Sequence, residues 1–378
     1  MRSRSSVPPP TVVLGRFPPP TDGQTLATEQ CASFLDGAFD VVRLDTEPPG
    51  PPALTAHPRF DLTRAVHFLG LRRRLTAALR ERPDAPVLWH AISPAPLGHL
   101  RDVLATVPTF APGQPVAGVL HRATFDALFR SPLTRPTARR LVGRLDALVF
   151  QSEPLALRCA PFVPEAKRVV IPNTVREAVC PSGDAVAARR DRGPGAPLHV
   201  LFLSNHLPEK GHADVLEAVG TLTAQGIRIR ATFAGGWPSD AARAAFTARA
   251  RALGVDASIT GPLHDAAEVA RLHLDADVFV LPTTHPTETQ PIAILEALAA
   301  GTPVVVVDRP VLADLVGPVG VLVPPHAPDA IAHAIAALAE PDRWRRASAN
   351  ARARFEARFA PGVVGKAWRT LARDLSRA

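Results

Sequence analysis

Residues 276–307 read ADVFVLPTTHPTETQPIAILEALAAGTPVVVV. An apolar run at Val278–Leu281 leads through a polar loop into an alanine- and leucine-rich stretch, and a run of four valines follows at Val304–Val307. Pro291 suits a helix start, because its ring fixes φ and the N–H that it lacks would be unpaired there. The segment therefore predicts a strand, a loop, a buried helix over Ile292–Ala300 and a second strand, which is the repeating unit of a parallel sheet.

The same alternation extends over the whole chain. Short runs rich in β-branched residues alternate with alanine-rich segments of helical period, and this pattern predicts parallel sheets covered on both faces by helices. The other predicted strands are Thr11–Gly15, Phe39–Leu44, Pro86–His90, Pro115–His121, Ala147–Phe150, Arg168–Ile171, Leu198–Leu203, Ile229–Ala234, Ala257–Thr260 and Val319–Val323.

The chain of 378 residues is longer than one hydrophobic core usually organises. Residues 179–197 are polar and rich in proline and glycine, and we interpret them as a linker between a domain over 1–178 and a domain over 198–355. A helix over 356–378 could pack back on the first domain. The prediction is an α/β protein with two Rossmann-like, doubly wound domains, whose ligand lies in a cleft at the carboxyl ends of the strands.

Composition narrows the class of protein. Apolar residues make up 46% and charged residues 21%, as in ordinary folded proteins. Three widely spaced cysteines fit neither a disulfide framework nor a zinc knuckle, so a reducing compartment is expected. No stretch has the pattern of a signal peptide or a membrane span. We expect a cytoplasmic protein, with peripheral contact at the inner membrane face as an additional hypothesis.

The net charge of +8 comes from the first half of the chain, where residues 1–190 hold 24 Lys and Arg against 16 Asp and Glu. One interpretation is a surface for an anionic acceptor or anionic lipid, and the other is an arginine-rich background composition. The basic segment LRRRLTAALRER, Leu71–Arg82, has the same two interpretations, a membrane-facing helix or a plain solvated helix. Nucleic-acid binding is not expected, because the chain has no zinc-finger spacing, no RNP pattern and no tyrosine.

Two segments of the chain carry charged residues that suit the binding of a ligand. Glu296 is a lone carboxylate on the predicted buried helix, so it needs either an internal arginine or amide partner, or a pair of vicinal ribose hydroxyls. Glu288 lies in the loop before that helix, and the N–H groups near residues 290–292 with the helix dipole form an anion site suited to a diphosphate. Lys210, in LSNHLPEKG after the strand Leu198–Leu203, is one of three lysines and either contacts phosphate or is solvated.

The spacing Glu288-x7-Glu296, the PEKG at Pro208–Gly211 and ADVFVLPT at Ala276–Thr283 together resemble the retaining GT-B glycosyltransferases of family 4, the glycosyl transferases group 1. The resemblance covers roughly residues 200–360. In the first half the likeness is looser and rests on LGRFPPPTDGQT at 14–25, HRATF at 121–125 and VIPNTV at 170–175.

The resemblance implies a GT-B enzyme that transfers a sugar from a UDP-, GDP- or other nucleoside-diphosphate donor to an acceptor hydroxyl, with retention and without a metal or other cofactor. Catalytic roles fall on Glu288 at a donor-sugar hydroxyl, Lys210 at the diphosphate and His121 beside the donor sugar. Glu296 is assigned to the ribose, Gly23 to a loop over the phosphates, and the backbone of 261–264 to the base. The implied donor-binding set is Gly23, Asn205, Lys210, Leu263, Glu288, Thr289, Gln290, Pro291, Ile292 and Glu296.

The chain departs from the family pattern at three positions. Asn205 stands where many members have an arginine, and Arg122 and Thr289 stand where they have glycines. These changes put acceptor and donor-sugar details in doubt. They favour the alternative of a non-catalytic nucleotide-sugar-binding protein. A nucleotide-sugar 2-epimerase or a hydrolase on the same scaffold is the other alternative. The acceptor stays unknown.

Overall fold

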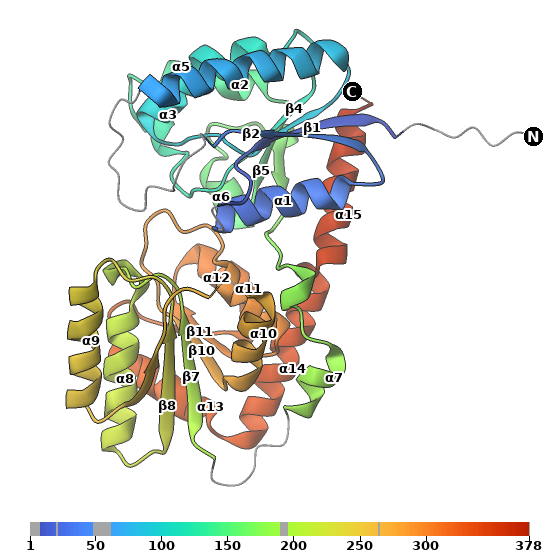
Figure 1. Ribbon diagram of the computed structural model, residues 1–378. Helices are drawn as coiled ribbons and strands as arrows, with labels where there is room; N and C mark the ends of the chain where they lie inside the picture. The colour runs from blue at the N-terminus through green and yellow to red at the C-terminus, as the bar shows by residue number, and fades with distance from the viewer. Residues whose placement is uncertain (1–7, 20–21, 48–61, 190–195, 264, 378) are drawn as a thin grey trace, which may run out of the picture. The chain divides into compact units, whose positions relative to one another are not determined.

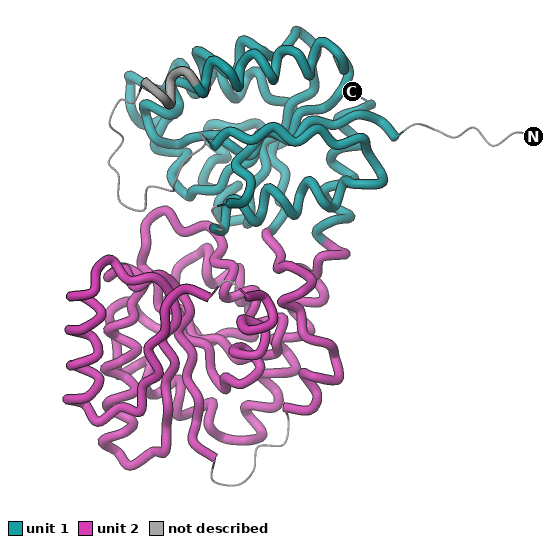
Figure 2. The backbone as a smooth tube through the Cα atoms, in the orientation of Figure 1, with its two compact units in different colours: residues 1–172, 364–378 teal, residues 173–363 magenta. Residues whose placement is uncertain are grey.

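The computed structural model describes residues 8–19, 22–47, 62–189, 196–263 and 265–377. The chain divides into two compact units, which Figure 2 shows in separate colours. Unit 1 consists of Met1–Pro172 and Val364–Ala378, and unit 2 consists of Asn173–Val363. The division therefore comes before the predicted linker 179–197. Within that stretch, residues 190–195 lie outside the described part, and Gly183–Ala188 form helix α7 of unit 2.

Unit 1 is built on a parallel sheet of six strands in the order β2-β1-β3-β4-β5-β6. Its strands are β1 (Pro10–Gly15), β2 (Asp40–Asp45), β3 (Val87–Trp89), β4 (Val116–Val119), β5 (Ala147–Phe150) and β6 (Arg168–Val170). The chain first adds a strand on one side of β1 and then builds outward on the other side. The strand order consequently reverses between β1 and β3, and such a switch point is where open α/β sheets bind ligands.

Helices cover both faces of this sheet (Figure 1). They are α1 (Gly23–Leu35), α2 (Leu62–Glu81), α3 (Pro96–Arg101) with the π-helical turn η1 (Asp102–Thr106), α4 (Ala127–Arg130), α5 (Arg135–Arg144), α6 (Glu153–Arg158) and the last helix, α15 (Pro361–Leu375). Helices α1 and α15 share one core with the sheet, in which Leu35 and Trp368 pack with Val13 and Val149. Figure 1 shows α2 and α5 on the opposite face.

Unit 2 holds a second parallel sheet of six strands, in the order β12-β11-β10-β7-β8-β9. Its strands are β7 (Leu198–Leu203), β8 (Ile229–Ala234), β9 (Asp256–Ile259), β10 (Val278–Leu281), β11 (Val304–Val307) and β12 (Val321–Val323). Its helices, besides α7, are α8 (His212–Ala224), α9 (Asp240–Ala252), α10 (Ala266–Asp275), α11 (Ile292–Ala299), α12 (Pro310–Val316), α13 (Pro328–Leu338) and α14 (Pro341–Arg358). Here the order reverses between β7 and β10.

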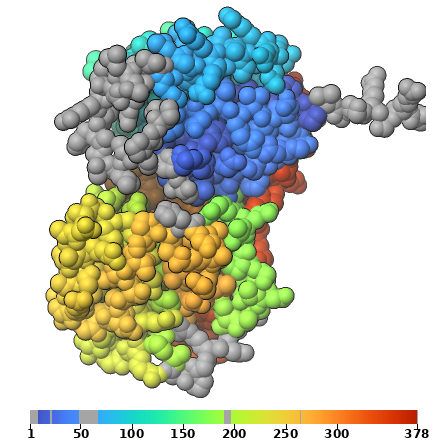
Figure 3. Space-filling view, in the orientation of Figure 1, coloured from blue at the N-terminus to red at the C-terminus, as the bar shows by residue number. Residues whose placement is uncertain are grey.

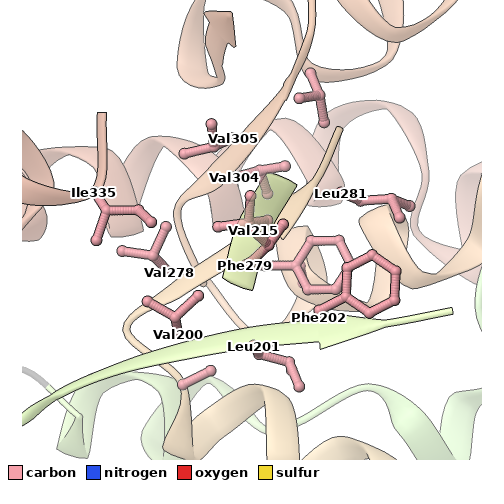
Figure 4. Close-up of a cluster of buried hydrophobic side chains, with 14 of the residues drawn as sticks. Val200, Leu201, Phe202, Val215, Val278, Phe279, Leu281, Val304, Val305 and Ile335 are labelled. Carbon is pink, nitrogen blue, oxygen red and sulfur yellow. The ribbon is translucent and has the colours of Figure 1, made fainter. Parts of the chain in front are cut away.

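The core of unit 2 is made of the continuous apolar runs that define the central strands. Figure 4 shows side chains of β7, β10 and β11 with Val215 of α8 and Ile335 of α13. Both faces of these strands are covered, which explains why their sequences are apolar without alternation. Five predicted strands, those at 147–150, 198–203, 229–234, 278–281 and 304–307, are confirmed with the same bounds, and the others shift by one or two residues.

No helix in the described ranges is both long enough and apolar enough to span a bilayer.

Candidate functional site

The switch point of unit 2 brings together two of the predicted residues. Lys210 lies in a 3₁₀ turn (Pro208–Lys210) after β7, and Glu288 lies in the loop after β10, the neighbouring strand. Lys210 Nζ donates to Glu288 Oε2, and Thr283 Oγ1 donates to the same oxygen at 3.2 Å. Each of the two charged side chains is only 15% exposed. An ion pair this shielded from water places a fixed charge arrangement at the ligand-binding edge of the sheet.

The two loops that carry this pair are also joined through their backbones. Glu209 O accepts a hydrogen bond from Thr284 N at 2.7 Å. Gly211 adopts a left-handed φ of 78°, and a Cβ there would lie 2.8 Å from Pro282 O. Only glycine combines that φ with so close an approach. Gly211 therefore lets the lysine loop and the Glu288 loop pack directly together.

The loop before α11 is anchored on its other side. Gln290 Oε1 accepts from Asn173 N at 2.5 Å, and Asn173 Nδ2 donates to Gln290 O at 3.3 Å. The Gln290 side chain is thus used to hold the loop. Pro291 is the N-cap and α11 begins at Ile292, where the sequence predicted the helix to begin. The ψ of 122° at Pro291 is extended, so this residue precedes the first helical turn. Ile292, as the first helical residue, has an N–H without an intrahelical acceptor.

Glu296 is 13% exposed in its side chain, as expected for a carboxylate on a largely buried helix. Its Oε2 lies 3.5 Å from Nε2 of His273, a fully buried residue of α10. Among the described residues, no arginine or backbone amide donates to Glu296, so the arginine or amide partner that the sequence suggested is not found there, and the contact is with a histidine instead. Sequence reasoning missed His273, because nothing in a single sequence shows that α10 faces α11.

The other predicted donor residues lie on loops of unit 2. Asn205 follows β7 and its Oδ1 accepts from Gly236 N at 3.3 Å, so the side chain connects the loops after β7 and β8. Thr289 is buried. Leu263 follows β9 and is half-buried, whereas His264 of the predicted base-contacting segment lies outside the described residues.

In unit 1, His121 follows β4 and contacts a histidine that sequence reasoning did not select. Its Nε2 lies 3.3 Å from Nδ1 of His90, which directly follows β3 at the switch point. Burial lowers the pKa of His121 to about 4, and burial together with the neighbouring ring holds the pKa of His90 well below its usual range. Both rings are therefore neutral at pH 7, and the N–H of one ring donates to the unprotonated nitrogen of the other.

Gly23 lies in a helix, although a loop was predicted at this position. It is the first residue of α1, whose N-cap Asp22 accepts from the amides of Gln24 and Thr25 in a capping box. The reason is that the Asp22 carboxylate pairs with the free amides of a helix start and fixes the helix at this point.

A pocket opens at the β1–β3 switch point of unit 1. Leu14, Trp89, Leu71 and Leu75 line its apolar wall, and Arg101 and Asp102 line its polar wall. Asp102 is buried, and its carboxylate accepts from Arg101 Nη2 at 2.6 Å and from Ser93 N at 2.8 Å. Burial raises the pKa of Asp102 to about 6 against these two donors. The pocket is small, and its buried carboxylate is already satisfied by Arg101 and Ser93.

Residues 189–354 match the protein-family model described as Glycosyl transferases group 1. The chain is 34% identical over 160 residues to the GDP-mannose-dependent alpha-(1-6)-phosphatidylinositol dimannoside mannosyltransferase of Mycobacterium tuberculosis. The aligned segment covers 42% of this chain and 40% of that protein. Over 193 residues it is 31% identical to the D-inositol 3-phosphate glycosyltransferase of Corynebacterium glutamicum, covering 48% and 45%. The matched part spans less than half the length of these relatives.

Solved structures resemble nearly the whole chain. The Anabaena protein HepE in complex with UDP aligns with a TM-score of 0.71 at 16% identity, over 97% of this chain and 100% of that one. Sucrose-phosphate synthase from Thermosynechococcus elongatus aligns with a TM-score of 0.71 at 20% identity, over 97% and 99%. With the two six-stranded parallel sheets, these likenesses show the GT-B fold, two Rossmann-like domains in one chain, as the sequence predicted.

Proposed function

We propose that the protein is a retaining glycosyltransferase of family 4 that uses a nucleoside-diphosphate sugar as donor. The observation that carries the proposal is the shielded Lys210–Glu288 pair at the β7–β10 switch point, next to the start of α11. The family match over 189–354 supports it independently, because that segment contains both loops and Glu296.

The donor diphosphate is assigned to Lys210 and the free amides at the start of α11. An ammonium group has three donors, so Lys210 can keep its bond to Glu288 and still donate to phosphate oxygens. The positive end of the α11 dipole adds to the attraction. We assign Glu288 to a hydroxyl of the donor sugar, because its other carboxylate oxygen can accept a hydrogen bond, and Thr289, Gln290 and Pro291 to the backbone that lines the donor.

Glu296 is assigned to the ribose. A carboxylate that contacts His273 through one oxygen keeps the other oxygen for a hydroxyl donor. Asn205 and the backbone at Leu263 are assigned to the donor's phosphate side and base. In unit 1, His121 is assigned to the donor sugar and acceptor, and Gly23 to the phosphates.

The proposed step is attack on the same face of the sugar that the diphosphate leaves. A bond forms between the acceptor oxygen and the anomeric carbon while the bond from that carbon to the β-phosphate oxygen breaks. The acceptor proton passes to the departing phosphate oxygen. Lys210 and the α11 amides stabilise the charge that develops on the diphosphate, a task that preorganised donors perform well, so no metal ion is required in this proposal.

The names of the relatives suggest donors and acceptors for a first screen. One relative is named a GDP-mannose-dependent phosphatidylinositol dimannoside mannosyltransferase, another a D-inositol 3-phosphate glycosyltransferase, and HepE was solved with UDP. We propose that unit 1 binds the acceptor. The three cysteines are free thiols, which supports the proposed reducing, cytoplasmic location.

The test is donor turnover with each nucleotide sugar, with and without candidate acceptors, with the anomeric configuration of the product read by NMR. We expect transfer with retention that is unchanged by EDTA, and losses of at least about a hundredfold in Lys210→Met and Glu288→Gln. Lys366→Met, an exposed lysine of α15, is the matched control and should keep full activity.

Other outcomes would decide against the proposal. Conversion of the donor sugar to its 2-epimer without acceptor would assign the protein to the epimerases. Nucleotide binding without any turnover would indicate a binding protein. A product with inverted anomeric configuration would exclude the retaining mechanism but would not contradict the assignment of the donor site.

A further inference from the structure

Four of the exposed leucines of unit 1 lie on α2 and on the segment formed by α3 and η1. Leu97 and Leu100 of α3 and Leu104 of η1 are 73%, 45% and 63% exposed. Their spacing of three and four residues places them on one face of the continuous helical segment. Leu69 of α2 is 60% exposed. Single exposed leucines are ordinary on a protein surface, whereas a stripe of neighbouring ones marks an interaction surface.

Contacts between the helices make this surface continuous. Arg101 is the last residue of α3, and its guanidinium lies 5.2 Å from the ring centroid of Phe68 in α2. His99 Nε2 lies 2.9 Å from Thr137 Oγ1, which joins α3 to the first turn of α5. Helices α2, α3 and α5 therefore form one layer, and in Figure 3 the light-blue atoms of α2 lie at the molecular surface.

The same layer is strongly basic. Its exposed arginines are Arg72, Arg73, Arg74, Arg80, Arg101, Arg135, Arg139 and Arg140. Of the described side chains on α2, α3, η1 and α5, Glu81 is the one exposed carboxylate, and Arg82 Nη1 lies 3.1 Å from it. Asp102 is buried and paired with Arg101. We call these eight arginines with Leu69, Leu97, Leu100 and Leu104 the leucine–arginine surface.

The structure changes the interpretation of the basic segment Leu71–Arg82. Leu71, Leu75 and Leu79 of α2 are buried against the core, so this helix offers arginines but no apolar face to a partner. The apolar part of the surface comes instead from α3 and η1. Neither α2 nor the α3–η1 segment alone presents both a basic and an apolar surface. The two are combined only in the folded unit.

We propose that the leucine–arginine surface docks on an anionic lipid bilayer. Leucine side chains gain by entering the region between head groups and acyl chains, and each arginine near an anionic surface adds to the attraction. A surface with arginines around a leucine stripe and almost no exposed carboxylate matches both requirements. The proposal is independent of the transferase assignment, because binding to a bilayer needs neither donor nor turnover.

The test is sedimentation of the full chain with vesicles of phosphatidylglycerol and phosphatidylcholine in equal parts, and with vesicles of phosphatidylcholine alone. We expect binding to the anionic vesicles only, weakening as salt is raised. The triple variant Leu97→Gln, Leu100→Gln, Leu104→Gln should lower the partition coefficient by at least about tenfold. Its matched control replaces Leu157, Leu322 and Val363, which are exposed elsewhere, by glutamine and should bind like the wild type.

A second variant tests the charges, which the fold does not need. Arg73→Gln, Arg139→Gln and Arg140→Gln should lower binding by about fivefold for each charge removed. Equal losses in the leucine triple and its control, or no binding to anionic vesicles at low salt, would overturn the proposal. So would a self-association in sedimentation velocity that the leucine triple abolishes, because the surface would then belong to a second copy of the chain.

Discussion

At the scale of single residues, the sequence predicts which side chains are chemically unusual but not which ones meet. Glu296 stands out as a charge on an apolar helix, Lys210 as one of three lysines in the chain, and Glu288 through its position eight residues before Glu296. The Lys210–Glu288 contact joins residues 78 positions apart, and it follows from the order of β7 and β10 in the sheet. His90 and His273 were missed for the same reason, since their importance lies in a neighbour from another element.

His206 gives a prediction about acid stability. Its ring stacks on Trp237 with centroids 3.7 Å apart, and burial, with the nearby His212, lowers its pKa to about 4. The unfolded chain takes up a proton near pH 6.5 and the folded chain does not, so His206 makes the fold less stable as pH falls from about 6.5 to 4. The variant His206→Phe keeps an aromatic ring stacked on Trp237 and removes the group that takes up the proton.

We expect the loss of unfolding free energy between pH 7 and pH 5 to be smaller by about 1 kcal/mol in His206→Phe than in the wild type. Urea denaturation at the two pH values measures it. An acid loss that is identical in both proteins would show that the ring does not resist protonation.

At the scale of elements, the strands were predictable because buried parallel strands are continuous apolar runs that end at proline, glycine or polar residues. The loops were less predictable from the sequence. The start of α1 at Gly23 depends on the Asp22 capping box, and the position of the α11 loop depends on Asn173, 117 residues from Gln290. The Asn173–Gln290 contact is long-range and leaves no local pattern, whereas the capping box is local and was overlooked in the sequence.

A substitution at Gly211 tests whether the Lys210 loop and the Glu288 loop depend on close packing at Pro282. Gly211→Ala must place a methyl group against Pro282 at a left-handed φ, whereas Gly226→Ala has a similar φ of 79° and open space around it. We expect the first substitution to cost at least about 1 kcal/mol more than the second in urea denaturation. It should also weaken nucleotide binding, because the Lys210 loop is displaced. Equal costs for both would mean that the packing on Pro282 is unimportant.

At the scale of the whole molecule, the chain passes between its two units twice, after Pro172 and before Val364. The sequence left open which domain the last helix covers, because an amphipathic helix with Trp368 and Leu371 fits either core. In the structure these residues are buried in the core of unit 1, with α1 and the sheet.

Trp368→Ala should therefore destabilise unit 1 by about 3–5 kcal/mol, the usual cost of removing a buried aromatic side chain. Hydrogen exchange should rise in α1 and β1, while unit 2 keeps its protection. Trp344→Ala, a buried tryptophan of unit 2, is the matched control and should show the reverse. Unchanged protection in α1 after Trp368→Ala would contradict this packing.

The central claim is that the charged residues at the β7–β10 switch point bind a nucleoside diphosphate. Titration calorimetry with UDP, GDP and their sugars measures this most directly when it is run on the wild type, Lys210→Met and Lys366→Met. We predict one site per chain for at least one nucleotide, lost in Lys210→Met and unchanged in Lys366→Met. Binding that is equally tight in all three proteins, or absent from the wild type with every nucleotide, would contradict the account.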